Sequence, residues 1–290
     1  MSVSKASATT PRCLLLGAGK EKGFLLIGAI FSLQLKGKLV YYDKLIGVSV
    51  GGLIATLINL ELTFDQLYKE AINFNIFESF RDFSFDAKEG LFSPAKIRQR
   101  VDFWMKLKFG KLVNFLELHN MTGKHLILVA TDQRDPEDPK PVYFDYLTTP
   151  FYSVSKAVVE SCLIPGFFET NSYQFIDGVF SDPFPIEKVD TGDEGAKVDA
   201  FLLKDKYPAD SNKIVNSIQS IFSALDIPTK ILIQTKMKNL SKNVRVIILL
   251  RIIKEWNWKN ATGVYLTFEE KKKLVLDGAN QTWDAFAHIG

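Results

Sequence analysis

The chain has 290 residues, of which 47% are hydrophobic, so it can bury the core of one large α/β domain or two smaller ones. Its net charge of only +3 argues against a dedicated nucleic-acid-binding protein, because such proteins carry a stronger basic excess. Two cysteines, Cys13 and Cys162, cannot build a disulfide framework, which favours a reducing compartment.

The apolar runs of the chain are short. The N-terminal residues lack the charged region followed by an apolar region that marks a signal peptide. The longest apolar runs, 24–35 and 244–253, fall short of the roughly 20 residues that a membrane-spanning helix needs. We therefore expect a cytoplasmic protein without a signal peptide or transmembrane segment, and one that can contact a membrane peripherally.

In the first half of the chain, short apolar runs alternate with helical patterns. The first predicted strand ends in glycines, and each of the first two predicted strands is followed by a predicted helix, which is typical of an α/β fold with a parallel sheet. The predicted elements are strands at 14–16 and 44–48 and helices at 24–36, 50–60, 63–75 and 93–108.

The second half continues the alternation. A polar turn at 134–139 predicts a hairpin between two strands. The predicted elements are strands at 125–130, 142–144, 173–176, 200–203 and 244–250, and helices at 153–162, after Ser211 and from Thr267. Because no repeat or linker divides the chain, we expect residues 1–12 to be a flexible segment and 13–290 to form one domain.

A nucleophile elbow is predicted after the second strand. Gly47-Val-Ser49-Val-Gly51 matches G-x-S-x-G, between a predicted strand and a predicted helix. So tight a turn requires small neighbours, and it presents the serine hydroxyl at a helix N-terminus, where developing negative charge is favoured. Ser49 is the candidate nucleophile, with Gly47 and Gly51 as the elbow glycines. The alternative is a glycine-rich turn with an idle serine.

A glycine-rich loop at 17–23 (GAGKEKG) joins the first strand to the first helix. Glycines leave backbone N–H groups able to point at an anion. A P-loop requires a serine or threonine after its lysine, and a dinucleotide-binding loop has its third glycine one position earlier. Since a candidate nucleophile lies two elements downstream, an oxyanion hole fits best. A purely structural turn is the alternative.

Ser49 requires a base, and the sequence offers an aspartate or a histidine. Asp177-Gly178 follows a predicted strand, where such a pair is usually only a turn. The order Ser49, Asp177, His288 matches an α/β-hydrolase triad. However, only 48 residues precede Ser49, and His288 lies two residues from the C-terminus, where fraying is common. His119 is expected to be an ordinary histidine, as is His125. We therefore favour a Ser49–Asp177 dyad.

Together these motifs resemble the patatin-like phospholipases, which have an oxyanion loop of the type G-G-G-x-[KR]-G, a nucleophile elbow and a D-G-[GA] motif. The resemblance extends over most of the chain. Other similar segments are 90–98, 122–132, 161–168 (S-x-x-I-P-x-x-F) and 177–186.

The resemblance implies a mostly parallel central sheet flanked by helices in three layers, with the elbow early in the chain. It implies a lipid acyl hydrolase of the phospholipase A or lysophospholipase type, which works through a Ser49 acyl-enzyme with Asp177 as base and needs no cofactor or metal. Its substrate is a lipid or phospholipid. The family motifs place the oxyanion hole at Gly17, Ala18, Gly19, Lys22 and Gly23, and they assign supporting roles to Gly178 and Asp182.

Four departures from the family pattern stand out. The oxyanion loop has Ala18 where glycine is usual, and it is one residue longer, which can tilt a donor. Val179 and Pro183 replace a glycine and an asparagine of the Asp-Gly motif. These departures leave two alternatives open, a non-catalytic lipid-binding or scaffolding protein on the same fold and a nucleotide-binding α/β protein.

Two aromatic segments have two interpretations each. Six phenylalanines between 74 and 92 predict either core packing or a lipid-facing lid. The stretch 104–111 mixes cations with aromatic residues and predicts either a solvated helix face or contact with anionic lipid.

Overall fold

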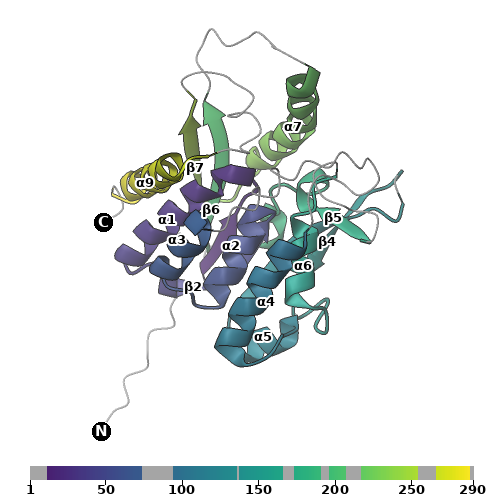
Figure 1. Ribbon diagram of the computed structural model, residues 1–290. Coiled ribbons are helices and arrows are strands. Elements are labelled where there is room, and N and C mark those ends of the chain that lie inside the picture. The colour runs from purple at the N-terminus through teal and green to yellow at the C-terminus, as the bar shows by residue number, and fades with distance from the viewer. Residues whose placement is uncertain are drawn as a thin grey trace.

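The computed structural model describes residues 12–73, 94–135, 137–165, 173–190, 196–206, 217–253 and 266–287, with side chains from 227 onward in the helix that begins at 217. Figure 1 shows a central sheet with helices packed around it. The six phenylalanines between 74 and 92, and His288, lie outside the described residues.

The described strands form one seven-stranded sheet in the order β4-β3-β2-β1-β6-β7, and β5 also pairs with β3. The β1–β2, β2–β3, β1–β6 and β6–β7 ladders are parallel, whereas β4 and β5 run antiparallel to β3. The predicted parallel core and the predicted hairpin are therefore confirmed. The strands are β1 Arg12–Leu16, β2 Tyr42–Val48, β3 His125–Asp132, β4 Lys140–Phe144, β5 Phe175–Asp177, β6 Lys197–Lys206 and β7 Val244–Ile252.

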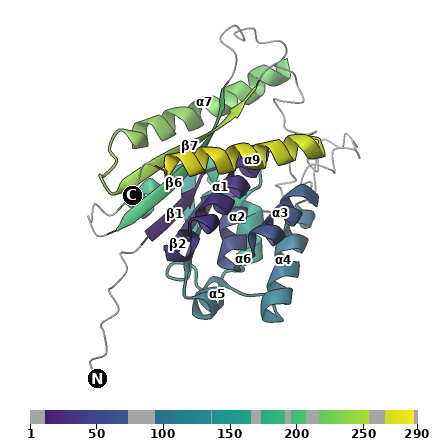
Figure 2. The ribbon, with the colours of Figure 1, turned by 90° about the vertical axis from the view of Figure 1, so that its left-hand side faces the viewer.

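Helices cover both faces of the sheet. On one face α1, α2, α6 and α9 share a hydrophobic core with the strands, and α7 packs against the other face together with residues 184–189 (Figures 1 and 2). This is the three-layer arrangement expected. The helices are α1 Gly23–Leu35, α2 Val50–Asn59, α3 Phe64–Asn73, α4 Ala95–Phe109, α5 Phe115–Thr122, α6 Val154–Ser161, α7 Ser217–Met237 and α9 Phe268–Ala285.

The central strands are apolar on both sides because each side meets helices. In β1, Leu14 and Leu16 pack into the core shared with α1 and α2, and Cys13 and Leu15 pack into the core on the side of α7. Side chains alternate across a strand, so a continuous apolar run fills both cores. Cys13 and Cys162 are both buried and unpaired.

Two helices begin with capping boxes, at the positions where the sequence predicts helices from 63 and from Thr267. The Thr63 N–H donates to Gln66 Oε1 at 2.9 Å, and Thr267 and Glu270 cap α9 reciprocally. Strand β6 is longer than predicted, because its last residues, Lys204–Lys206 in sequence, are charged and resemble a loop. Of the helices described, none is long and apolar enough to span a membrane.

Helices α1 and α9 cross at very close range through two glycines. A Cβ atom on Gly28 would lie 1.9 Å from the carbonyl oxygen of Val275, and one on Gly278 would lie 2.0 Å from that of Leu25. Real Cβ atoms never approach other atoms this closely, so each helix needs a glycine where the other passes. The contact ties the C-terminal helix to the helix that follows the glycine-rich loop.

Candidate active site

Ser49 lies in a strained turn between β2 and α2. Its backbone has φ 56° and ψ −129°, a conformation that non-glycine residues rarely adopt. The residue is 6% exposed and stands at the N-cap position of α2. This is the geometry of a nucleophile elbow, in which strain holds the serine at the end of a strand.

The elbow glycines are required by close main-chain contacts. A Cβ atom on Gly47 would lie 2.5 Å from the Gly51 carbonyl oxygen, and one on Gly51 would lie 2.2 Å from the Leu16 carbonyl oxygen. The first contact closes the turn upon itself. The second presses α2 against the end of β1, where the glycine-rich loop begins.

Strand β3 brings Asp177 to the elbow. Val48, the last residue of β2, pairs with Val129, and Asp177, the last residue of β5, pairs with the next residue, Ala130. Strand β5 thus continues along β3 where β2 stops, so Asp177 lies beside the point at which the chain turns into Ser49. Gly178 permits this approach, because a Cβ atom there would lie 2.5 Å from the Val129 carbonyl oxygen.

The carboxyl group of Asp177 is completely buried, and burial raises its pKa to about 7. The nearby Ser49 side chain, the hydrogen bond from the Val179 N–H and the charge of Lys20 act in the opposite direction and limit the rise. Burial dominates because an ionised carboxylate loses its hydration in an apolar environment. The group therefore titrates near neutral pH.

The two oxygens of Asp177 have different surroundings. Oδ1 accepts a hydrogen bond from the Val179 N–H at 2.9 Å. Oδ2 is buried and has no well-aligned partner among the described residues. The Ser49 hydroxyl thus lies near enough to lower the pKa of Asp177 but is not aligned with Oδ2. Catalytic hydrogen bonds are often loose before substrate binds.

The glycine-rich loop uses some of its N–H groups to hold its own shape. Gly17 donates to the Phe201 carbonyl oxygen at 2.9 Å, Lys22 donates to that of Gly19 at 3.0 Å, and the Gly23 N–H points at carbonyl oxygens within the loop. Among the described residues, no acceptor meets the N–H groups of Ala18 and Gly19. The substitution at Ala18 leaves such an N–H group in place.

The extra residue of the loop is accommodated in a short 3-10 turn, Lys20–Lys22. Lys20 takes a φ of +50°, and Glu21 turns inward and is only 4% exposed. Lys22 reaches Asp205 on β6, with 3.1 Å between Nζ and Oδ2. The Lys22 side chain therefore points to the sheet rather than standing free.

Asp182 lies just after the Asp-Gly motif and is 2% exposed. Its Oδ2 accepts from the Tyr143 hydroxyl at 2.6 Å, and its Oδ1 accepts from Lys236 Nζ at 2.7 Å. The Asp182 N–H donates to the Gly178 carbonyl oxygen at 2.8 Å. These bonds connect the segment after Asp177 to β4 and α7, which suits a supporting role.

Ser161 is a site residue that the sequence reasoning did not single out. Its wholly buried hydroxyl accepts a hydrogen bond from the Ser49 N–H at 3.0 Å. The Ser49 N–H is thereby occupied and does not point at a substrate oxyanion. A signal was present, since Ser161 begins the S-x-x-I-P run.

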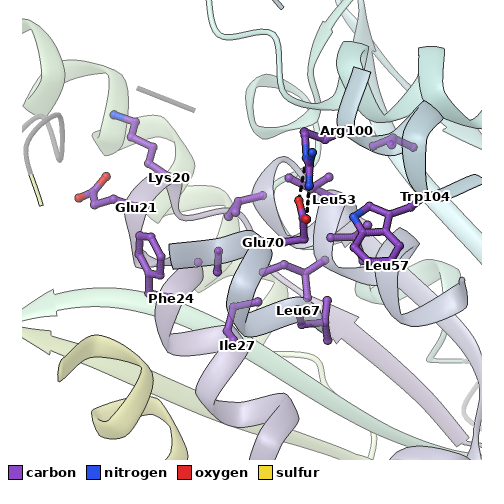
Figure 3. A pocket seen from close by; sticks show the side chains of 15 residues that line it. Lys20, Glu21, Phe24, Ile27, Leu53, Leu57, Leu67, Glu70, Arg100 and Trp104 are labelled. Carbon is purple, nitrogen blue, oxygen red and sulfur yellow. Dashed lines mark hydrogen bonds and ion pairs between the residues drawn. The ribbon is translucent and has the colours of Figure 1, made fainter. Parts of the chain in front are cut away.

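An apolar pocket opens beside the elbow (Figure 3). It contains about 730 Å³ of empty space, part of which is open to solvent. Val50, which directly follows Ser49, lines it together with Lys20 of the loop. The other walls come from α1 to α4 and include Phe24, Leu53, Leu57, Leu67 and Trp104.

The two described histidines lie away from this site. His125 pairs with Lys44 at the start of the β2–β3 ladder, whereas the elbow follows its end. His119 Nδ1 donates a hydrogen bond to the Lys124 carbonyl oxygen at 3.1 Å, and its ring stacks on Tyr146. In the part of the chain that the structure describes, no three His, Cys, Asp or Glu residues are grouped to hold a metal ion.

Comparison with known proteins agrees with this geometry. A family model described as patatin-like phospholipase matches residues 14–190. The structure is similar over 95% of this chain to VipD from Legionella pneumophila, with a TM-score of 0.60, 16% identity and 66% of that chain covered. It is similar over 95% to the type III effector ExoU of Pseudomonas aeruginosa, with a TM-score of 0.56, 13% identity and 52% of that chain covered.

At these identities the likeness to the two proteins shows a shared fold. The chain spans only 66% and 52% of their respective lengths. No curated protein sequence matches the chain.

Proposed function

Because the chain belongs to the patatin-like phospholipase family, whose members are lipid acyl hydrolases, we propose that it cleaves fatty acyl esters with Ser49 as nucleophile and Asp177 as base. The observation that carries the proposal is the β3 ladder, which pairs Val48 and Asp177 with consecutive residues beside the strained turn at Ser49.

Proton transfer from Ser49 is the first step. An ordinary aspartate titrates near pH 4 and is a weak base for a hydroxyl group. A base is most effective when its pKa is close to the working pH, and burial raises the pKa of Asp177 to about 7. The unpartnered Oδ2 is the atom that accepts the proton when the Ser49 hydroxyl rotates towards it.

The Ser49 oxygen then attacks the ester carbonyl, and the carbonyl oxygen becomes an oxyanion. The N–H groups of Ala18 and Gly19 are the donors we assign to it, because those of Gly17, Lys22 and Gly23 are already engaged. Donors that are fixed before the reaction stabilise the developing charge without reorganisation. The alcohol or lysolipid leaves with the proton, and water hydrolyses the acyl-enzyme with Asp177 again as base.

The pocket suggests where the acyl chain lies. Its walls are mostly apolar, and Val50 and Lys20 connect it to both the elbow and the loop. An acyl chain buried there would gain about 0.8 kcal/mol for each methylene group removed from water. This supports a substrate with a fatty acyl ester, such as a phospholipid or lysophospholipid. We infer that the protein reaches such a substrate by peripheral contact with a membrane.

Hydrolysis of a lipid panel tests the proposal. Phospholipids, lysophospholipids and neutral esters are incubated with the wild type, with Ser49→Ala and with Ser241→Ala, a control in the turn before β7. We expect the wild type and the control to release fatty acid and to react with a fluorophosphonate, and a chelator to leave both rates unchanged. Ser49→Ala should fall below about a hundredth of the wild-type rate.

Two outcomes oppose the proposal in different ways. A Ser49→Ala variant that keeps its activity would show that another residue is the nucleophile. A folded wild type that neither hydrolyses any lipid nor reacts with the fluorophosphonate would favour the lipid-binding alternative.

A further inference from the structure

Strands β6 and β7 extend beyond the sheet where the glycine-rich loop begins. Strand β1 pairs with β6 only from Lys197 to Phe201, but β6 and β7 stay paired as far as Lys206 and Ile252. The extension rises past the rest of the sheet in Figure 1. The loop leans on it, since a Cβ atom on Gly19 would lie 2.2 Å from the Leu203 side chain.

Four charged side chains connect the loop to this extension. Asp205 and Arg251 are paired in the β6–β7 register, and Arg251 Nε lies 2.6 Å from Asp205 Oδ1. Arg251 also reaches Glu21 of the loop, with 2.5 Å between its Nη1 and Oε1. Asp205 in turn holds Lys22 through its other oxygen. Arg251 of β7 therefore contacts Glu21, and Asp205 of β6 contacts Lys22, the next residue of the loop.

The cluster is largely withdrawn from water. Arg251 is 6% exposed and Glu21 4%, and the side chains of Asp205 and Lys22 are 13% and 15% exposed. Burial acts to raise the pKa of Asp205, but Lys22 and Arg251 outweigh it and lower that pKa. Charges this buried are tolerated when they are paired, and removing one partner is strongly destabilising to the others.

These contacts explain how the longer loop keeps its form. The family pattern G-G-G-x-[KR]-G has one residue fewer than 17–23, and the 3-10 turn that takes up the extra residue centres on Glu21. Without a partner, a buried Glu21 would drive the turn outward, towards solvent. Its contact with Arg251 keeps the turn inward, directly after the N–H groups of Ala18 and Gly19.

We propose that Arg251, together with Asp205, is a positioning residue that holds Glu21 and Lys22 and thereby fixes the direction of the oxyanion-loop N–H groups. This inference rests on the proposed function. It assigns Arg251 an effect on turnover rather than on substrate binding, because oxyanion donors act on the transition state.

The β6–β7 pair supplies a matched control. Asp199 and Arg245 are paired across the same two strands six positions earlier, and their side chains also form an ion pair. That pair lies beside Tyr42, which donates to Asp199 at 2.5 Å, at the opposite end of the strands from the loop. Arg251→Met and Arg245→Met therefore remove the same kind of interaction, but only the first one touches the loop.

The experiment compares both variants, and Glu21→Gln, with the wild type on a soluble chromogenic acyl ester. We expect Arg251→Met to lower kcat by about 10- to 100-fold with KM within about twofold, a loss typical of disturbed transition-state stabilisation. Glu21→Gln should lower kcat less, and Arg245→Met should keep it within about twofold. A variant that combines Glu21→Gln with Arg251→Met should have no lower kcat than Arg251→Met alone, because Glu21 and Arg251 act through one contact.

Hydrogen exchange of the amides of residues 18–23 gives a readout independent of turnover. It should accelerate in Arg251→Met and not in Arg245→Met. The proposal would be overturned if Glu21→Gln and Arg251→Met both kept the wild-type kcat. It would also be overturned if Arg251→Met and Arg245→Met lost equal amounts of kcat. A wild type without activity would instead refute the proposed function. In that case, loop amides that exchange equally fast in the wild type and in Arg251→Met would also refute the anchoring. If Arg251→Met does not fold, Glu21→Gln decides by the same two measurements.

Discussion

The elbow around Ser49 and the glycine-rich loop face each other across the end of β1, yet different forces hold them. The elbow is fixed by main chain, through the glycine contacts at Gly47 and Gly51 and the pairing of Asp177 with β3. The loop also has main-chain hydrogen bonds, but side chains tie it to β6 and β7, through the ion pairs of Glu21 and Lys22. Close main-chain contacts allow few residue types other than glycine at the positions that make them, whereas one ion pair can be removed while the other remains. The elbow should therefore tolerate substitution less well than the loop.

The largest effect should come from the base on the elbow side. Asp177→Asn keeps the shape but cannot accept the Ser49 proton, so we expect the hydrolysis rate to fall by about 10³-fold or more. Because the buried charge is gone, the melting temperature above pH 7 should rise by at least about 2 °C. His119→Ala is the control and should stay within a few-fold of wild type. A loss of about 10⁴-fold in His288→Ala would instead indicate a triad.

The second effect concerns the point where the two regions touch. Gly51→Ala would place a Cβ atom 2.2 Å from the Leu16 carbonyl oxygen and 2.7 Å from that of Gly17. We expect a loss of about 3 kcal/mol in the free energy of unfolding and about a 100-fold loss of activity. Gly52→Ala, whose nearest atoms lie at 3.2 Å, should lose much less in both measurements. Equal losses would mean that the elbow does not press on β1.

The third effect is the pH dependence of kcat/KM. Asp177 must be ionised to act as a base, and burial raises its pKa to about 7. The rate should therefore fall about tenfold for each pH unit below 7 and level off above it. Arg251→Met should lower kcat/KM at every pH without changing the pH at which the rate begins to fall, because Arg251 acts on the loop and not on Asp177. If the rate falls only below about pH 4, Asp177 is not the base.

The smallest effect should come from the hydrogen bond behind the elbow. Ser161→Ala leaves the buried Ser49 N–H without its acceptor, which costs about 1–3 kcal/mol of stability. We expect kcat to fall several-fold while KM is preserved. Ser155→Ala, on the same helix and equally buried, should not change kcat and serves as the control. If both variants behave alike, the bond to Ser49 has no special role.

Local patterns in the sequence predicted much of this architecture. The alternation of buried strands and helices predicted the parallel core, and G-x-S-x-G in its strand-to-helix context predicted the turn at Ser49. The predicted starts of two helices, at Thr63 and Thr267, coincide with capping boxes in the structure. All of these signals depend on residues within a few positions of each other, so they can be interpreted without knowledge of the fold.

What the sequence could not predict depends on contacts between distant segments. Nothing near Asp177 indicates that β5 runs antiparallel along β3 just where β2 ends. Asp205 and Arg251 are charged residues at strand ends and resemble solvated positions until the β6–β7 register pairs them. Ser161 lies 112 residues along the chain from Ser49, whose N–H donates a hydrogen bond to its hydroxyl. The pocket likewise needs four helices from separate parts of the chain.

The position of β6 has a consequence for any attempt to shorten the protein. The family match ends at residue 190, but β6, from Lys197, is the inner neighbour of β1 in the sheet. A chain cut at 190 would leave β1 as an open edge with unpaired N–H and C=O groups, a template for aggregation. It would also lose α9, whose Gly278 interlocks with α1. Protease cleavage near 190 should thus yield an insoluble fragment rather than a smaller enzyme.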